Sequence, residues 1–154
     1  MTDLLNIESL SKDELSSFII NHENSQSFAL SLEERTRVWQ ILLSTIEKPS
    51  VTLTIREMCL KCCRILSRDP TGINQVIQNN HVDLLIQIAS ISTPGNSLTD
   101  VDRVQEAVHL QAKKVLFNLI KQSFTVRARC CHNGFLGDIF KAISQHKVSE
   151  FNPI

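Results

Sequence analysis

The sequence has few of the residues that interrupt helices or favour strands and turns. It contains four glycines, four prolines, one tryptophan and no tyrosine in 154 residues, and aromatic residues make up only 5% of the chain. This composition excludes collagen-like and low-complexity chains, and a hydrophobic fraction of 42% excludes a natively unfolded one. We therefore expect one domain of ordinary size with a hydrophobic core of its own.

The chain also lacks net charge, because 16 Lys and Arg residues balance 16 Asp and Glu residues. Without a global positive field, binding to nucleic acid or to a membrane surface is disfavoured. No stretch approaches the roughly eighteen uninterrupted apolar residues of a membrane helix. The acidic residues 1–18 contain neither a basic n-region nor an apolar h-region, so no signal peptide is predicted. We expect a cytoplasmic protein.

Five cysteines are present: Cys59, Cys62, Cys63, Cys130 and Cys131. An odd number with two adjacent pairs is a poor disulfide framework, so we interpret them as reduced thiols. A zinc site, or a metal- or redox-sensing role, is the alternative. The first cluster lies in a periodic segment without the turn that zinc ligands usually occupy, and buried cysteine behaves as a small hydrophobe. We predict no metal and no cofactor.

The punctuation of the chain by clustered glycine and proline predicts helices and not strands. Two capping boxes, Ser11 with Glu14 and Ser31 with Glu34, should begin helices near 13–21 and 31–46. Apolar residues at helical spacing then predict further helices over residues 51–68, 73–78, 82–91, 104–120, 124–132 and 136–143. The wide apolar arc of the 51–68 segment suggests packing on more than one side.

The order of a long, a short and an amphipathic helix occurs twice, with an offset of 50 residues that aligns 65–68 with 115–118. A repeated unit of this kind predicts an all-α armadillo/HEAT-like α-solenoid, a superhelical stack of helical repeats. We divide the single domain 1–154 into capping helices 1–48, a repeat 50–91, a loop 92–103 and a repeat 104–147. A globular helical bundle is the alternative.

Charge is distributed unevenly along the chain. Residues 1–50 hold four basic and eight acidic residues, and residues 51–154 hold twelve basic and eight acidic ones. Lys61, Arg64 and Arg68 fall on one helical strip, and Lys114 is the counterpart of Arg64 in the second repeat. The strip is a candidate binding surface. The alternative is a solvated face with local ion pairs, for instance to Glu57 or Asp69.

Asn118 occupies the position equivalent to Arg68 and is enclosed by apolar residues. In a solenoid this amide could line the inner groove and bind a peptide backbone. A structural asparagine that bonds to the neighbouring loop is the alternative.

Sequence signatures of catalysis are absent. The chain has no glycine-rich phosphate loop, no His-Glu-x-x-His, no Gly-x-Ser-x-Gly and no paired-carboxylate motif. We therefore predict a binding protein and not an enzyme.

Three stretches resemble, in order and spacing, the N-terminal part of the synembryn family, also called "resistance to inhibitors of cholinesterase". They are Asn-His-Glu-Asn-Ser-Gln-Ser-Phe at 21–28, Arg-Ile-Leu-Ser-Arg-Asp at 64–69 and Leu-Phe-Asn-Leu at 116–119. The resemblance extends over most of the 154 residues.

The resemblance implies a cytosolic armadillo-type protein that binds G-protein α subunits (Gα). Members of the family act as receptor-independent guanine nucleotide exchange factors and as chaperones for nascent Gα. Their groove takes the C-terminal helix of Gα, and Arg64, Arg68 and Asn118 match the positions that contact this helix and its carboxylate. A monomer recruited to the cell cortex through Gα is the corresponding expectation.

Family members are several times longer than this chain, which we therefore expect to be the beginning of a longer solenoid. Nucleotide exchange by the 154 residues alone is not expected, whereas binding of a Gα C-terminal peptide is. The alternative function is that of a general armadillo-type adaptor for another helix or peptide, unrelated to G proteins.

Overall fold

The computed structural model describes residues 11–90 and 100–132, together with residues 134 and 137. Within these ranges the chain forms seven α-helices and no strand, so the predicted all-α, α-solenoid-like class is confirmed. The helices are α2 (Lys12–His22), α3 (Leu32–Glu47), α4 (Leu53–Leu66), α5 (Ile73–Val76), α6 (Asn79–Ser90), α7 (Asp100–Gln122) and α8 (Phe124–His132). The predicted helix at 136–143 lies outside the described residues.

Both predicted capping boxes are present. The backbone amide of Ser11 donates to Glu14 Oε2 at 2.8 Å, and that of Ser31 donates to Glu34 Oε1 at 3.0 Å. In return, each serine hydroxyl accepts from the backbone amide of its glutamate. Hydrogen bonds from the backbone and side chain of Ser31 lower the pKa of Glu34. These local bonds fix where α2 and α3 begin.

Helix α7 begins earlier than the sequence analysis predicted. The sequence predicts a loop over residues 92–103, but in the structure α7 begins at Asp100. The apolar stripe that guided the prediction starts only at Val104. Asp100 and Asp102 lie in the first turn, where acidic side chains interact favourably with the positive end of the helix dipole. A polar first turn cannot be detected from the spacing of apolar residues.

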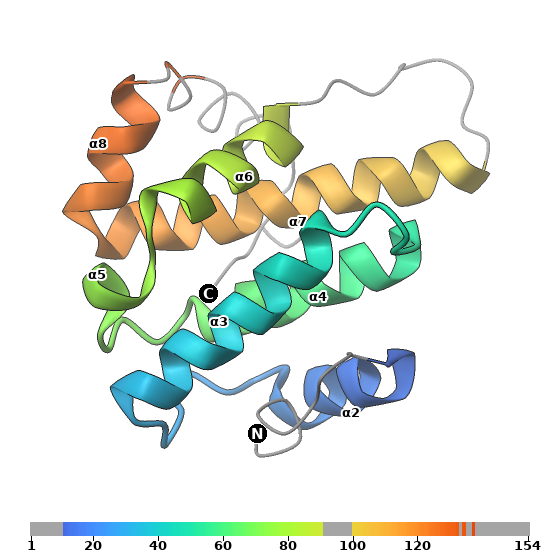
Figure 1. The fold of residues 1–154 in the computed structure, drawn as a ribbon, viewed down its shortest axis with the longest axis horizontal. Helices are drawn as coiled ribbons and strands as arrows, with labels where there is room; N and C mark the ends of the chain where they lie inside the picture. Colours follow the sequence, from blue (N-terminus) through green and yellow to red (C-terminus); the bar gives the residue numbers. More distant parts are fainter. Residues whose placement is uncertain (1–10, 91–99, 133, 135–136, 138–154) are drawn as a thin grey trace.

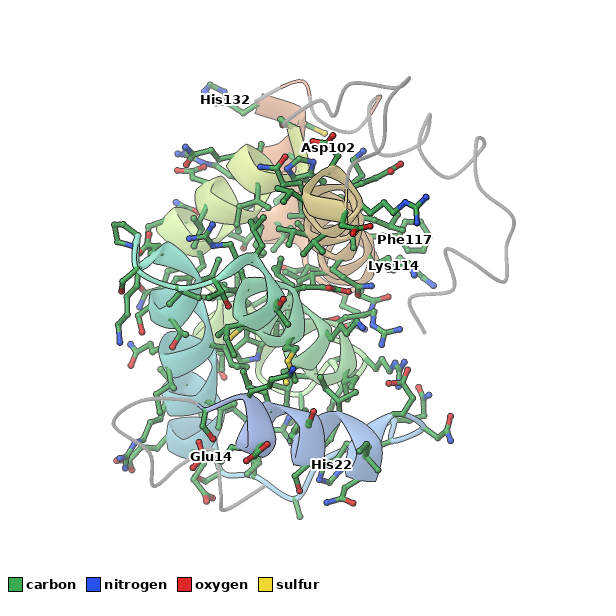
Figure 2. All side chains as sticks on the ribbon, turned by 90° about the vertical axis from the view of Figure 1, so that its right-hand side faces the viewer. Glu14, His22, Asp102, Lys114, Phe117 and His132 are labelled. Carbon is green, nitrogen blue, oxygen red and sulfur yellow. The ribbon has the colours of Figure 1, made fainter. Side chains whose placement is uncertain are left out.

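The helices stack on one another along the chain (Figure 1). Helix α4 packs against α2, α3 and α7, and α6 packs against α7 and α8. In the view along the helices, α3 and α6 lie on one side of α4 and α7, with α2 below them (Figure 2). The wide apolar arc predicted for residues 51–68 is explained by these three neighbours of α4.

One continuous hydrophobic core joins all the helices. Its largest fully buried side chains come from successive helices and include Leu15, Leu42, Leu60, Leu85 and Leu116. Ile65 and Val115, which the 50-residue offset aligns, are both completely buried. The boundaries of the two repeats stay a prediction.

A glycine with positive φ precedes the short helix α5. Gly72 has a φ of 69°, and a Cβ at this position would lie 2.9 Å from Leu32 Cδ1 at the start of α3. The site therefore combines a left-handed backbone with a close contact between two helices.

We predict that Gly72→Ala lowers the free energy of unfolding by about 1–2 kcal/mol, because the left-handed conformation costs an L-residue about that much. The tip of Leu32 is exposed and can move away from the added Cβ, so the contact should add little. Urea denaturation measures the loss. Gly134→Ala is the matched control, since Gly134 has the same φ of 69° but no atom within 4 Å of the added Cβ, and its loss should be similar. A much larger loss at Gly72 would show that Leu32 cannot move.

A carboxylate-binding arginine pair at the end of α4

The predicted site residues come together at the C-terminal end of α4. Arg64 lies in the last turn of α4, Arg68 follows the helix, and Asn118 lies on α7, the helix packed alongside. Asn118 Nδ2 donates to Ser67 Oγ at 2.9 Å and to the carbonyl oxygen of Arg64 at 3.4 Å. The three residues, 54 positions apart at the extremes, thus form one cluster.

Both arginines converge on the carboxylate of Glu23, which directly follows α2. The Nη2 atom of Arg64 lies 3.0 Å from Glu23 Oε1, and that of Arg68 lies 3.9 Å from the same oxygen. Arg68 also donates to the backbone carbonyl oxygens of Glu23 and Ser25. Burial, then the charge of Arg64, lowers the pKa of Arg68. The cluster thus holds the carboxylate of Glu23 beside one buried and one half-buried guanidinium group.

The guanidinium of Arg64 retains a donor that Glu23 does not use. Its Nε atom is buried and has no hydrogen-bond partner among the described residues. The side chain as a whole is 11% exposed. Nη2 and Nε lie on one edge of the guanidinium, which is the edge that a carboxylate contacts in a bidentate pair.

Asn118 is completely buried, and its side-chain amide points to α4. Gln122, one turn further along α7, donates from Nε2 to the carbonyl oxygen of Arg68 at 3.4 Å. These two amides connect α7 to the end of α4, which carries the arginines. The contacts of Asn118 are those of a structural asparagine, which the sequence analysis gives as the alternative. A direct contact of Asn118 with a ligand stays a prediction.

Two further basic residues, Lys61 and Lys114, belong to the predicted strip. Lys61 Nζ forms an ion pair with Glu57 one turn away, at 3.3 Å, which is the local pairing proposed as the alternative for the strip. Lys114, the predicted counterpart of Arg64, is buried on α7. The suggested pairing of the strip with Asp69 is wrong, since Asp69 binds Arg35 instead.

The segment that carries Glu23 is held in place by Asp69, a residue whose role the sequence analysis missed. Asp69 Oδ2 accepts from Arg35 Nη1 at 3.1 Å and from the backbone amide of Phe28 at 2.9 Å. Arg35 also donates to the carbonyl oxygens of Phe28 and Leu30. Burial acts to raise the pKa of Asp69, but hydrogen bonds from Thr71, Phe28 and Arg35 outweigh it and lower the pKa.

Four of the five cysteines lie in the hydrophobic core. All five are free, and all except Cys131 are buried. Burial raises the pKa of Cys59 to about 12 and, with a contribution from Cys131, that of Cys130 to about 11. Burial likewise raises the pKa of Cys62 and Cys63. Among the described residues, no three Cys, His, Asp or Glu side chains gather where they could hold a metal ion. The buried cysteines thus pack as hydrophobes.

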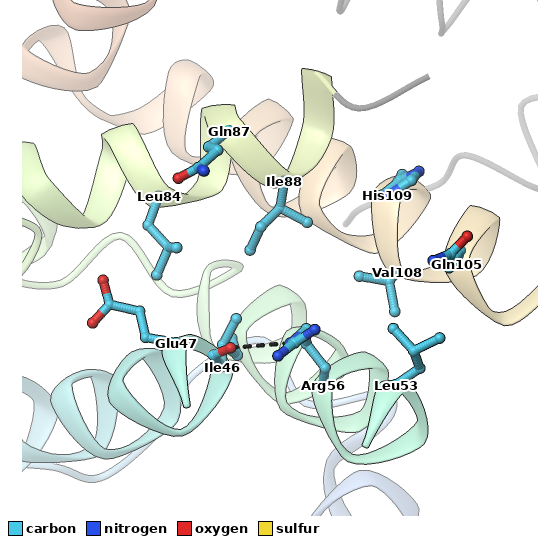
Figure 3. A pocket seen from close by; sticks show the side chains of 10 residues that line it. All are labelled: Ile46, Glu47, Leu53, Arg56, Leu84, Gln87, Ile88, Gln105, Val108 and His109. Atoms are coloured by element: carbon cyan, nitrogen blue, oxygen red, sulfur yellow. Dashed lines mark hydrogen bonds between the residues drawn. The ribbon is translucent and has the colours of Figure 1, made fainter. Parts of the chain in front are cut away.

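A separate pocket of about 580 Å³ lies between α3, α4, α6 and α7 (Figure 3). Leu84 and Ile88 of α6 point into it from one side. Arg56 lines the opposite side, and its Nε donates to the carbonyl oxygen of Ile46 at 3.0 Å, so that this arginine caps the end of α3. The pocket shares no lining residue with the arginine cluster. Among the described helices, none combines the length and the apolar character that crossing a membrane requires.

Comparison with known proteins gives one curated relative. The chain is 28% identical over 134 residues to "Chaperone Ric-8A" of Bos taurus, a member of the synembryn family. The match covers 85% of this chain but 25% of Ric-8A, so the chain spans about a quarter of the length of this relative. No protein-family model and no solved structure matches the chain. This similarity supports the resemblance seen in the sequence.

We predict that Asp69→Asn lowers the free energy of unfolding at neutral pH by about 3 kcal/mol, because it leaves the buried guanidinium of Arg35 without its counter-charge. The pKa of Asp69 is lower in the folded than in the unfolded chain. Its contribution is therefore complete above the unfolded pKa of about 4 and is lost as the pH falls through the folded value.

Urea denaturation at pH 7 and pH 3 tests this prediction, and the difference between wild type and Asp69→Asn should narrow at pH 3. Asp13→Asn is the control, because Asp13 is exposed in the first turn of α2. A difference that is the same at both pH values would show that charge is not the cause.

Proposed function

We propose that this chain binds the C-terminal helix of a G-protein α subunit and that Arg64 and Arg68 receive its terminal carboxylate. The observation that carries the proposal is the convergence of the buried Arg68 and the half-buried Arg64 on one carboxylate, at 3.9 and 3.0 Å. The similarity to Ric-8A supports the choice of partner, because it covers 85% of the chain. Both arginines and Asn118 match the positions singled out by the resemblance to the synembryn family.

The mechanism is one of capture and involves no covalent step. Binding the C-terminal helix withdraws it from the nucleotide-binding domain of Gα, which loosens the guanine site and lets GDP escape. A partner can shift this equilibrium only by binding the nucleotide-free conformation more tightly than the GDP-bound one. The same capture of an otherwise exposed helix would serve a chaperone of nascent Gα. Exchange and chaperone activity are therefore two consequences of one binding event, and neither needs a catalytic residue.

The proposal assigns the 154 residues binding but not exchange. They correspond to a quarter of Ric-8A. We propose that withdrawing the bound helix far enough to release GDP needs further contacts with Gα beyond those to its C-terminal helix. A cytoplasmic monomer that reaches the cell cortex through Gα completes the proposal. In this account Arg64 and Arg68 contact the ligand, whereas Asn118 holds Ser67 and the backbone of Arg64 in place.

We predict that Arg64→Gln and Arg68→Gln each weaken binding of a synthetic Gα C-terminal peptide about 10- to 100-fold, because a charge-assisted hydrogen bond contributes about 1.5–3 kcal/mol. Fluorescence anisotropy with a labelled peptide measures the affinity. Glutamine is preferred to glutamate, because a glutamate would face Glu23 and disturb α2. Circular dichroism checks that the fold is retained.

Lys61→Gln is the matched control, since it removes one positive charge from the exposed side of the same helix and should change the affinity less than twofold. Unchanged affinity in both arginine variants would remove the assignment of the site. Absence of binding of the Gα peptide to the wild-type chain would favour the general adaptor for another helix or peptide.

We further predict that Asn118→Ala lowers the free energy of unfolding by about 2 kcal/mol, because it removes a buried hydrogen-bond donor from Ser67 and Arg64. If Asn118 acts by positioning Arg64, the double variant Asn118→Ala/Arg64→Gln should bind the peptide no more weakly than Arg64→Gln alone. Losses of affinity that simply add would instead indicate that Asn118 contacts the ligand directly.

A further inference from the structure

The arginine pair already holds a carboxylate that belongs to the protein itself. We propose that Glu23 is an internal competitor, which occupies the site in the free protein and which the carboxylate of a ligand must displace. This inference rests on the proposed function, because it concerns how the same site is filled and emptied. It makes Glu23 the residue that sets the affinity of the site and its preference for a ligand that ends in a carboxylate.

Exposure distinguishes the fixed partners from the removable one. The side chains of Arg64 and Arg68 are 11% and 6% exposed, whereas that of Glu23 is 45% exposed. The arginines are part of the packed end of α4, and the glutamate approaches them from the solvent side. An ion pair with an exposed member is weak and is readily exchanged for another carboxylate.

Glu23 can leave without unfolding the segment around it. It caps the C-terminal end of α2, where the helix dipole disfavours an acidic side chain, so the arginines are what holds its carboxylate there. The chain beyond it is fixed separately at Phe28, whose backbone amide donates to Asp69. Between these points the backbone amide of Ser25 donates to the carbonyl oxygen of His22. Arg68 also donates to the backbone carbonyl oxygens of Glu23 and Ser25. Release of Glu23 therefore involves these bonds and the few residues before Phe28, but not the contact of Phe28 with Asp69.

A terminal carboxylate can form a bond that Glu23 does not. Glu23 accepts from Nη2 of Arg64, and the Nε of the same guanidinium has no partner among the described residues. A ligand carboxylate that binds both atoms in the bidentate arrangement gains one charge-assisted hydrogen bond over the internal glutamate. A peptide that ends in an amide lacks the negative charge and cannot make this exchange. The site should thus select free C-terminal carboxylates.

The experiment compares wild type with Glu23→Gln, using a Gα C-terminal peptide in its free-acid and amidated forms. When a competitor occupies the site for part of the time, the apparent affinity for a ligand is the intrinsic affinity multiplied by the fraction of molecules in which the site is empty. We expect Glu23→Gln to bind the free-acid peptide about three- to tenfold more tightly than wild type does. The amidated peptide should bind both proteins equally and more weakly.

Glu33→Gln is the matched control, because it removes the same charge from an exposed position in the first turn of α3, away from the arginines. A second measurement uses wild type alone. Hydrogen exchange at the amide of Ser25, which bonds to His22, should become faster when the free-acid peptide binds.

The possible results separate this inference from the proposed function. Tighter binding by Glu23→Gln, with faster exchange at Ser25, supports the internal competitor. Equal or weaker binding of the free-acid peptide by Glu23→Gln, while both proteins still prefer it to the amidated form, overturns the competitor and leaves the proposed function standing. Absence of any preference for the free acid in both proteins overturns the proposed function and the competitor with it.

Discussion

The buried carboxylate of Asp69 is the point on which the arrangement of the N-terminal helices depends. It lies just after α4 and bonds to Arg35 of α3 and to the backbone of Phe28, so that one side chain connects α4, α3 and the segment between α2 and α3. A buried ion pair of this kind is tolerated only when additional hydrogen bonds satisfy its remaining atoms. The amide of Thr71 and the carbonyl oxygens of Phe28 and Leu30 provide them. Because Phe28 is fixed in this way, the segment between Glu23 and Phe28 is held close to the arginine pair.

The parts of the fold that depend on local sequence could be predicted, and those that depend on distant contacts could not. The capping boxes at Ser11 and Ser31 act over three residues and were found directly. The apolar periodicity of α4 likewise located that helix to within a few residues. The polar first turn of α7 escaped detection, because Asp100 and Asp102 contribute through the helix dipole and not through burial.

The candidate site shows the same division. Arg64 and Arg68 could be singled out because their spacing places both on one face of a helical segment. Their partner could not, since Glu23 lies 41 residues from Arg64 and has no local feature that points to it. The pairing of Asp69 with Arg35, 34 residues apart, was missed for the same reason. Electrostatic partners at such separations become visible only when the packing of α2, α3 and α4 is known.

The arginine pair illustrates a conflict between stability and binding. Two guanidinium groups at the packed end of α4 without a counter-charge would destabilise the free protein, because each is largely removed from water without compensation. Glu23 supplies the counter-charge and so stabilises the ligand-free fold, but any stabilisation of that state is subtracted from the affinity for a ligand. An exposed, weakly held glutamate is a compromise between these demands. It keeps the arginines in position, and under the proposed function it would make a captured carboxylate easier to release.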